Sequence, residues 1–307
     1  MNIIDKESIF PILIPTDLYI DRYGNYNGFV EMNPSMYILD DGSFIILIRT
    51  VDCLKYKDGT FTIYGNKSVT DSTFISTSLY SIIRGKIDKD KFNLDNYEID
   101  KLIIKYNIEQ TPSAWCGIED IRFVNNNTIL ACIPEVNNGW PCICEGVLTD
   151  NILSINVKCN PYLSEKNWMP YITSAEKSKV IYSISPFVIK SIMEDDREEI
   201  ILSYQASNEL KGWRGSSNSI DLFGGNLFLI HKKEDRFYNR WLLFNQKTKQ
   251  ILYSKPFVFF RDTYIEFVCS LSIYKDKIYI GLGVNDNKAY IIQINKDEIM
   301  KLFVYHK

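Results

Sequence analysis

The sequence predicts an all-β fold, and three observations support this prediction. Aromatic and β-branched residues are abundant, with 20 Tyr and 17 Phe among 307 residues, and these residue types favour strands. Short strand-like runs recur along the chain, whereas amphipathic helical patterns are scarce. Turn-forming residues separate many of the runs, which is the pattern of successive antiparallel hairpins.

The strand-like runs follow one another through most of the chain. They span residues 35–39, 43–50, 72–84, 101–106, 118–124, 128–134, 145–148, 179–183, 187–192, 199–205, 226–231, 240–244, 264–274, 277–283 and 289–294. Turns rich in Asp, Asn, Gly or Lys lie at 40–42, 57–59, 125–127, 224–226 and 274–276. The helix-like stretch 191–199 carries three consecutive acids, and we interpret it as a solvated turn.

The number of strands selects the architecture. About twenty short antiparallel strands are too many for one sandwich, and a closed barrel would leave much of the chain unused. Blades of four strands accommodate the chain as about five blades. No linker rich in Pro, Gly or Ser divides the sequence, so we predict one domain over residues 1–307, a five-bladed β-propeller.

Charge and cysteine content narrow the functional classes. The net charge is −3, and basic residues are scattered among similar numbers of acids, which argues against a nucleic-acid partner.

The apolar stretch 9–14 is short and contains Pro11, so we expect neither an export signal nor a membrane span. Seven irregularly spaced cysteines then indicate reduced thiols and a cytoplasmic location. The pair Cys142 and Cys144 has no matching second pair, so we predict no metal site.

One segment, from Trp115 to Phe123, places three charged residues in an otherwise strand-like run. Alternation along a strand would direct Asp120 and Arg122 to one face and Glu119 to the other. Charged groups in an apolar strand require partners. Asp120 and Arg122 therefore either pair inside a blade or line a polar site.

Other polar residues lie near the ends of strand-like runs and are candidates for the same site. They are Asn33, Arg49, Lys166, Asn167, Trp168, Arg214, His231, Glu266 and Asp286. Trp115, Trp168 and Trp213 stand beside these clusters, and an indole face suits the C–H face of a pyranose. Each residue also has a structural interpretation: a solvated lysine, a strand-end histidine, acids that cap turns, and tryptophans that pack in the core.

The order of several short motifs resembles glycoside hydrolase family 130, the five-bladed propeller enzymes that are mostly β-mannoside phosphorylases, with related mannosidases and mannosyltransferases. The motifs are Asn33-Pro34, Arg49, Gly117-Ile118-Glu119-Asp120-Ile121-Arg122, Lys166-Asn167-Trp168-Met169-Pro170, Arg214-Gly215-Ser216 and His231. Residues 264–267 and 281–289 are similar to the C-terminal signature of propeller proteins that are classed with, or fused to, glycosyltransferases.

The resemblance implies a role for each candidate. Asp120 takes the position of the catalytic acid. Lys166, Asn167, Arg214 and His231 would bind phosphate. The remaining candidates would bind sugar: Asn33, Arg49, Glu119, Arg122, Trp168, Glu266 and Asp286. No cofactor is implied, and inorganic phosphate or a sugar phosphate would be the co-substrate.

A single carboxylic acid suffices for such chemistry. Inverting hydrolysis needs an acid for the leaving oxygen and a base for water, whereas phosphate arrives as an anion and needs only positioning and charge neutralisation. Arg122 next to Asp120 would favour the ionised carboxylate, which opposes direct proton donation. The resemblance implies that the proton instead passes through a hydroxyl of the bound sugar.

Two functions therefore remain open. The first is an enzyme that makes or breaks a β-mannoside or a similar glycoside with inversion, by phosphorolysis or by transfer from a sugar phosphate. The second is a catalytically silent propeller that binds glycans or a protein partner. Asp120, Arg122, Lys166 and Arg214 together favour the enzyme, whereas Ile121 in place of the family's proline favours the silent propeller.

Overall fold

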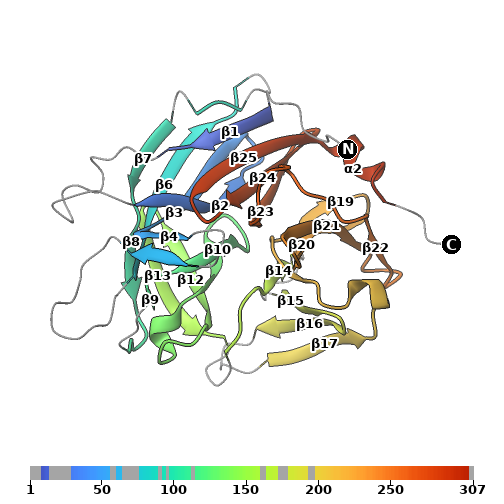
Figure 1. Cartoon of the computed structure of the whole chain (residues 1–307), viewed down its shortest axis with the longest axis horizontal. Coiled ribbons are helices and arrows are strands. Elements are labelled where there is room, and N and C mark those ends of the chain that lie inside the picture. Colours follow the sequence, from blue (N-terminus) through green and yellow to red (C-terminus); the bar gives the residue numbers. More distant parts are fainter. Residues whose placement is uncertain are drawn as a thin grey trace.

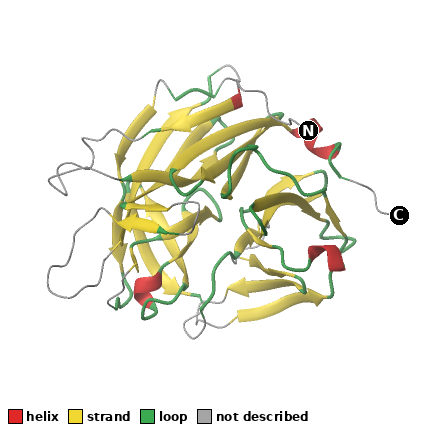
Figure 2. Cartoon of the chain, viewed as in Figure 1, coloured by secondary structure: helices red, strands yellow, loops and turns green. Residues whose placement is uncertain are grey.

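The computed structural model describes residues 8–13, 29–55, 60–63, 76–88, 92–94, 97–111, 115–159, 164–171, 179–192 and 198–303. Within these residues the strands form five main sheets around a central axis, and this arrangement confirms the five-bladed β-propeller (Figure 1). Strands dominate the described chain, as Figure 2 shows. The helical elements η2 (Pro134–Val136), η3 (Asn208–Leu210) and α2 (Lys296–Met300) are short.

The blades are numbered here in ring order, and their strands are named from the axis outward. Blade 1 contains β2 (Val30–Ile38), β3 (Ser43–Val51), β6 (Ser76–Lys86) and β7 (Tyr97–Lys101). Blade 2 contains β10 (Glu119–Phe123), β11 (Thr128–Cys132), β12 (Ile143–Thr149) and β13 (Ile152–Lys158). Blade 3 contains β14 (Met169–Tyr171), β15 (Lys179–Ile184), β16 (Phe187–Ile192) and β17 (Glu198–Tyr204).

Blade 4 contains β18 (Arg214–Gly215) and β19 (Ile220–Leu222), which both pair with β20 (Gly225–Lys233), followed by β21 (Phe237–Phe244) and β22 (Ile251–Tyr253). Blade 5 contains β23 (Glu266–Tyr274), β24 (Lys277–Val284), β25 (Lys288–Asn295) and, outermost, β1 (Ile9–Ile12). Two shorter strands add to these blades: β8 (Ile103–Tyr106) runs parallel to β13, and β9 (Trp115–Cys116) runs parallel to β6. Strands β4 (Cys53–Lys55) and β5 (Phe61–Ile63) form a separate two-stranded sheet.

The ring is closed by pairing between the two ends of the described chain. Strand β1 lies antiparallel to β25, with Ile9 opposite Ile292 and Ile12 opposite Ala289. The last blade is therefore built from both ends of the chain (Figure 1). The backbone N–H and C=O groups on the outer edge of β25 would otherwise face solvent, and they form hydrogen bonds with β1 instead.

The hydrophobic core lies in the seams between neighbouring blades. Buried apolar residues of the described chain form five clusters, and each cluster joins two adjacent blades. Met36 and Tyr279, for example, belong to the cluster between blades 1 and 5, and Leu47 and Phe123 to the cluster between blades 1 and 2. Burial of these side chains stabilises the ring, since apolar area removed from water contributes about 25 cal/mol per Å².

The predicted runs correspond to strands, but several boundaries differ, and the seven-residue strand β13 was not predicted. The run 101–106 covers the end of β7 and all of β8, because the chain leaves one sheet edge at Leu102 and joins the next. The predicted strand 128–134 ends at Cys132 and passes into η2. Residues 72–75, 57–59 and 193–197 of other predicted elements lie outside the described residues.

Two features of the described residues bear on the charge and cysteine arguments. The cysteines with described side chains, Cys53, Cys132, Cys142, Cys144, Cys159 and Cys269, are free thiols. No helix in the described part of the chain has the length and apolar character needed to cross a membrane.

Candidate functional site

A cavity of about 960 Å³ opens at the central axis, and every blade contributes to its walls. Its volume lies at the upper end of the range for ligand pockets. The lining comprises Met32, Asn33, Arg49, Val51 and Cys53 of the blade 1 segment; Glu119, Asp120, Pro134, Gly139, Trp140 and Pro141 of blade 2; Lys166 and Asn167 before blade 3; Gly212, Arg214, His231, Lys233 and Phe237 of blade 4; and Ile265, Phe267 and Asp286 of blade 5.

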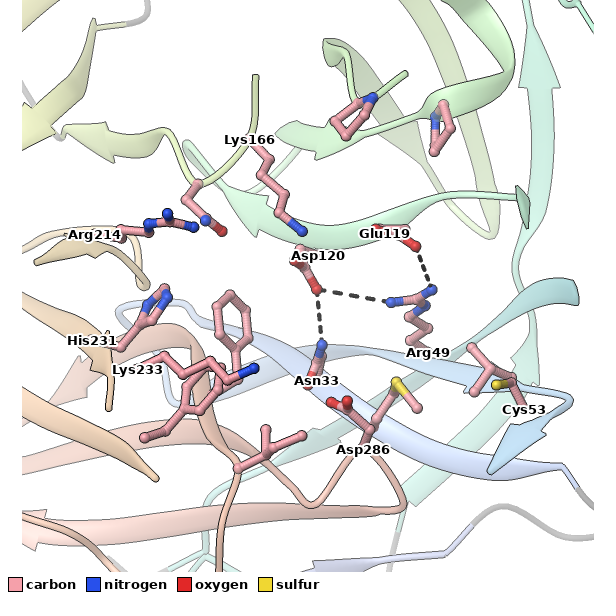
Figure 3. Close-up of a pocket in the computed structure, with 18 of the residues that line it drawn as sticks. Asn33, Arg49, Cys53, Glu119, Asp120, Lys166, Arg214, His231, Lys233 and Asp286 are labelled. Carbon is pink, nitrogen blue, oxygen red and sulfur yellow. Dashed lines mark hydrogen bonds and ion pairs between the residues drawn. The ribbon is translucent and has the colours of Figure 1, made fainter. Parts of the chain in front are cut away.

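The fold brings together nine of the twelve predicted site residues in this cavity. They are Asn33, Arg49, Glu119, Asp120, Lys166, Asn167, Arg214, His231 and Asp286. Figure 3 shows Arg214, His231 and Lys233 on one side of Asp120, with Arg49 and Glu119 on the other. Their individual roles stay predictions, but their convergence brings three acids and several cations into a single space.

Asp120 reaches the cavity because the backbone of β10 is irregular at this residue. The residue has a left-handed φ of 52°, and the pairing between β10 and β11 shifts register between Glu119 and Arg122. Such a bulge redirects side chains, so the simple alternation predicted for this segment does not hold. Glu119 and Asp120 consequently both line the cavity, although alternation would place them on opposite faces.

Asn33 holds the Asp120 carboxylate. Its Nδ2 donates to Oδ1 of Asp120 at 2.8 Å, and both side chains are largely buried. Asn33 also has a left-handed φ, 46°, at a register shift in β2. Strand β24 passes so close to this bulge that a Cβ at Gly283 would lie 2.0 Å from Oδ1 of Asn33. Glycine is therefore required at position 283 for this arrangement of Asn33.

Arg49 crosses the floor of the cavity and contacts both acids of blade 2. Its Nη2 lies 3.0 Å from Oε1 of Glu119, its Nη1 lies 4.0 Å from Oδ1 of Asp120, and its Nε donates to Oγ of Ser78 at 3.0 Å. Burial disfavours the charge of Arg49, but Glu119 and the neighbouring acids outweigh that effect and raise the pKa of Arg49 above its usual value. Arg49 is therefore a permanent cation beside the predicted acid.

Three further cations line the cavity without a carboxylate partner among the described residues: Lys166, Arg214 and Lys233. Arg214 lies opposite His231 in the pairing of β18 with β20. The backbone of Asn167 packs against Gly215, where a Cβ would lie 2.2 Å from the Asn167 carbonyl oxygen. This close approach brings the Lys166 loop next to Arg214. Unpaired cations that share a cavity favour an anionic ligand.

His231 contributes hydrogen bonding and not positive charge. The ring is 5% exposed, its Nδ1 lies 3.0 Å from Oγ of Ser216, and it stacks on Phe237 with ring centroids 5.4 Å apart. Burial, together with Arg122 and Arg214, lowers the pKa of His231 from 6.5 to about 3. The imidazole is therefore neutral at neutral pH, and its predicted contact with phosphate would be a hydrogen bond without an ion pair.

The burial of His231 predicts a pH dependence of stability. Between about pH 6.5 and about 3 the unfolded chain takes up a proton on this residue, while the folded protein does not. The free energy of unfolding should therefore fall as the pH falls, by up to about 1.4 kcal/mol per pH unit from this group. Urea denaturation at several pH values would show a shallower dependence for His231→Asn. Equal slopes for the two proteins would contradict the assignment.

Arg122 lies outside the cavity lining, contrary to its predicted contact with sugar. It is 1% exposed, its Nη1 donates to the carbonyl oxygen of Asp120 at 3.0 Å, and its Nε donates to the carbonyl oxygen of Ser216. Its guanidinium also lies over the ring of Phe267, 5.5 Å from the centroid. Arg122 therefore ties blade 2 to blades 4 and 5, and Arg49 is the arginine whose guanidinium approaches the Asp120 carboxylate.

Trp168 also lies outside the lining. It is 1% exposed and belongs to the apolar cluster between blades 2 and 3, where it meets Tyr182 edge to face at 5.6 Å. Trp213, at 7% exposure, packs between blades 3 and 4. Both tryptophans stabilise seams of the ring, and the side chain of Trp115 lies outside the described residues. The sequence neighbourhood of a polar motif was thus a poor guide to where an indole lies.

Glu266 is the third predicted sugar contact that the cavity excludes. It is fully buried and accepts hydrogen bonds from the backbone N–H of Phe259 (2.8 Å) and Phe260 (2.7 Å). It also accepts from Oγ1 of Thr263 at 2.6 Å and from Nδ2 of Asn239 at 3.1 Å. Glu266 therefore holds the loop before β23, and the adjacent residues Ile265 and Phe267 reach the cavity in its place.

The cavity residues that were not predicted include Lys233 and Trp140. Lys233 lies two residues after His231 on β20, so alternation alone could have placed it on the same face. Trp140 follows Asn137-Asn138-Gly139 in a loop, and no periodicity marks its position. Among the described residues, no group of three or more His, Cys, Asp or Glu side chains could hold a metal ion.

The fold and the cavity define the class: a five-bladed β-propeller with a polar central site. The sequence matches no protein-family model and no curated protein. A β-1,2-mannobiose phosphorylase from Listeria innocua, solved in complex with β-1,2-mannobiose, has a similar structure, with TM-score 0.60, 16% identity, and 96% of this chain and 98% of that chain covered.

Two other solved structures show the same likeness. A glycosyl hydrolase from Bacteroides ovatus has TM-score 0.60 and 12% identity, with 95% of this chain and 92% of that chain covered. A structure described with the glycoside hydrolase family 130 enzymes that target β-1,2-mannosidic linkages in Candida mannan has TM-score 0.60 and 14% identity, with 87% and 85% covered. These likenesses establish that the chain has the propeller fold of the mannoside phosphorylases and glycosidases.

Proposed function

We propose that this protein is an inverting glycoside phosphorylase that acts on β-mannosides, and that its reverse reaction transfers mannose from mannose 1-phosphate to an acceptor sugar. The observation that carries the proposal is the division of the cavity. Arg214, Lys233 and the neutral imidazole of His231 lie on one side of the Asp120 carboxyl, Arg49 and Glu119 lie on the other, and the Lys166 side chain extends next to Asp120.

The division matches the demands of the reaction. A phosphate oxygen attacks C1 of the mannosyl residue as the bond from C1 to the glycosidic oxygen breaks. The glycosidic oxygen gains a proton that originates on Asp120, and the leaving sugar departs with a free hydroxyl. Lys166, Arg214 and Lys233 neutralise the anion without any change of protonation. Because the attack inverts C1, a β-mannoside gives α-mannose 1-phosphate.

The pairing of Glu119 with Arg49 favours phosphorolysis over hydrolysis with Glu119 as the base. Hydrolysis with inversion needs a second carboxylate as a base for water. Glu119 is the acid next to Asp120, and its carboxylate is engaged by Arg49 at 3.0 Å. Phosphate needs no base. The structure from Listeria innocua is a phosphorylase that binds β-1,2-mannobiose, so this disaccharide is the first substrate to test.

The test follows both directions of the reaction. The protein is incubated with β-1,2-mannobiose and inorganic phosphate, and α-mannose 1-phosphate is followed by phosphorus NMR. In the reverse direction, phosphate release from α-mannose 1-phosphate is measured with a panel of acceptor sugars. We expect turnover that requires phosphate and saturates with it. Turnover at the same rate in phosphate-free buffer would show a hydrolase, and the absence of turnover in both directions would favour the silent propeller.

A matched pair of lysines tests the phosphate site. Lys233 lines the cavity, whereas its neighbour Lys232 pairs with Glu234 at 2.7 Å on the other face of β20. We expect Lys233→Gln to raise KM for phosphate about tenfold, the equivalent of one charge-assisted hydrogen bond. Lys232→Gln should leave this KM unchanged. Equal effects of the two substitutions would remove Lys233 from the phosphate site.

A further inference from the structure

Trp140 is an exposed indole at the wall of the cavity. Its side chain is 64% exposed, in contrast to Trp168, Trp213 and Trp241, which are each less than a tenth exposed. It is the exposed tryptophan among those whose side chains the structure describes. Because this indole stands at the wall of a polar cavity, it offers a large apolar face that a bound ligand can bury.

The loop that carries Trp140 is held in place before any ligand binds. The backbone N–H of Trp140 donates to the carbonyl oxygen of Asn137 at 2.9 Å, and that of Gly139 donates to the carbonyl oxygen of Pro134 at 3.0 Å. A rigid loop loses little conformational entropy when a ligand binds to it. The backbone that carries the indole is therefore preorganised.

The same loop is joined to the Lys166 loop. The carbonyl oxygen of Pro141, the residue after Trp140, accepts a hydrogen bond from the backbone N–H of Glu165 at 3.0 Å. Trp140 and Lys166 thus line one cavity from two loops in direct contact. The backbone that carries Trp140 is therefore held next to the backbone that carries Lys166.

Inversion at C1 determines on which sides of the mannosyl ring the phosphate and the leaving sugar lie. The attacking and leaving oxygens lie on opposite faces of the reacting carbon. Arg214, His231 and Lys233 belong to blade 4, whereas Asp120 and the Trp140 loop belong to blade 2, and these blades are not neighbours in the ring. With phosphate on the blade 4 side, the leaving oxygen faces Asp120, and the ring attached to it extends toward blade 2.

We propose that Trp140 is the platform for the acceptor sugar, the ring that leaves in phosphorolysis and attacks in the reverse reaction. This assignment rests on the proposed function. The indole would stack on the C–H face of a pyranose, so the acceptor is a sugar and not a small alcohol or water. Trp140 then determines specificity for the acceptor and has no part in binding the transferred mannose or the phosphate.

The test measures KM for the acceptor sugar and KM for α-mannose 1-phosphate separately. In the reverse reaction, we expect Trp140→Ala to raise KM for the acceptor sugar about tenfold, while KM for α-mannose 1-phosphate changes less than twofold. Trp140→Phe should recover much of the loss, because a phenyl ring also presents a flat apolar face. Phe223→Ala is the matched control, because Phe223 is an exposed aromatic residue, 38% exposed, that does not line the cavity.

Direct binding makes the outcome independent of turnover. Calorimetry with β-1,2-mannobiose should show about tenfold weaker binding for Trp140→Ala than for the unaltered protein, with equal binding of inorganic phosphate. This loss of affinity without any turnover would support the platform and overturn the phosphorylase. Turnover with unchanged acceptor KM and unchanged disaccharide affinity in Trp140→Ala would overturn the platform and leave the phosphorylase standing.

Discussion

Replacement of Asp120 by asparagine is expected to lower kcat for phosphorolysis by about 10²- to 10⁴-fold, the usual contribution of a general acid. The amide has the shape of the carboxyl group but cannot give up the proton that the leaving oxygen requires. Asparagine also tolerates the left-handed backbone of this position, where φ is 52°. The hydrogen bond from Asn33 can still be accepted by the amide oxygen.

The fold should survive this substitution, which makes the kinetic result interpretable. The thermal midpoint and the circular dichroism of Asp120→Asn should match those of the unaltered protein, and calorimetry should show that β-1,2-mannobiose still binds. A variant that retains more than a tenth of the original kcat would remove Asp120 as the acid. Loss of disaccharide binding along with activity would instead make Asp120 a binding residue.

Glu266→Ala is expected to destabilise the protein by about 3–5 kcal/mol, the range for removal of one partner from a buried charged network. The carboxylate is fully buried, and its donors are the N–H groups of Phe259 and Phe260, the hydroxyl of Thr263 and the amide of Asn239. Alanine would leave these donors without an acceptor and would open a cavity. Urea denaturation measures the change in the free energy of unfolding.

Two control variants should each destabilise the protein less than Glu266→Ala does. Glu266→Gln keeps one oxygen acceptor and should cost less than Glu266→Ala, although burial also raises the pKa of Glu266 and so reduces the stabilisation that its charge provides. Glu234→Ala removes an exposed acid from an ion pair with Lys232 and should change stability by less than about 1 kcal/mol. If Glu266→Ala retained full stability and raised KM for the disaccharide, Glu266 would be a substrate contact after all.

The fold was predictable from the sequence because the evidence for a propeller is local. Hairpins join residues close in sequence, and their turns carry Gly, Asn and Asp at positions such as 40–42, where Asp40, Asp41 and Gly42 form the turn between β2 and β3. Short strands next to the axis, such as β14 and β18, were not predicted. They have two or three residues, too few to show a period of two.

Most of the polar residues that line the cavity were predictable from the sequence, but the direction in which their side chains point was not. Motif order identified nine residues of the cavity, yet Arg122, Trp168 and Glu266 lie elsewhere. The bulges at Asn33 and Asp120 change which face a side chain takes, and strand alternation contains no information about them. Trp140 is exposed because of the packing of its loop, and exposure of one indole among several depends on tertiary structure.

The pairing of β1 with β25 also affects when the site comes into existence. These strands lie near opposite ends of the described chain, so during synthesis the first strand must wait until the last hairpin has left the ribosome. Contacts between such distant segments form slowly, since the intervening chain must be ordered first. The cavity draws on every blade. Ligand binding in a nascent chain therefore reports completion of the ring, and a truncated chain that lacks the final hairpin lacks the wall that Asp286 provides.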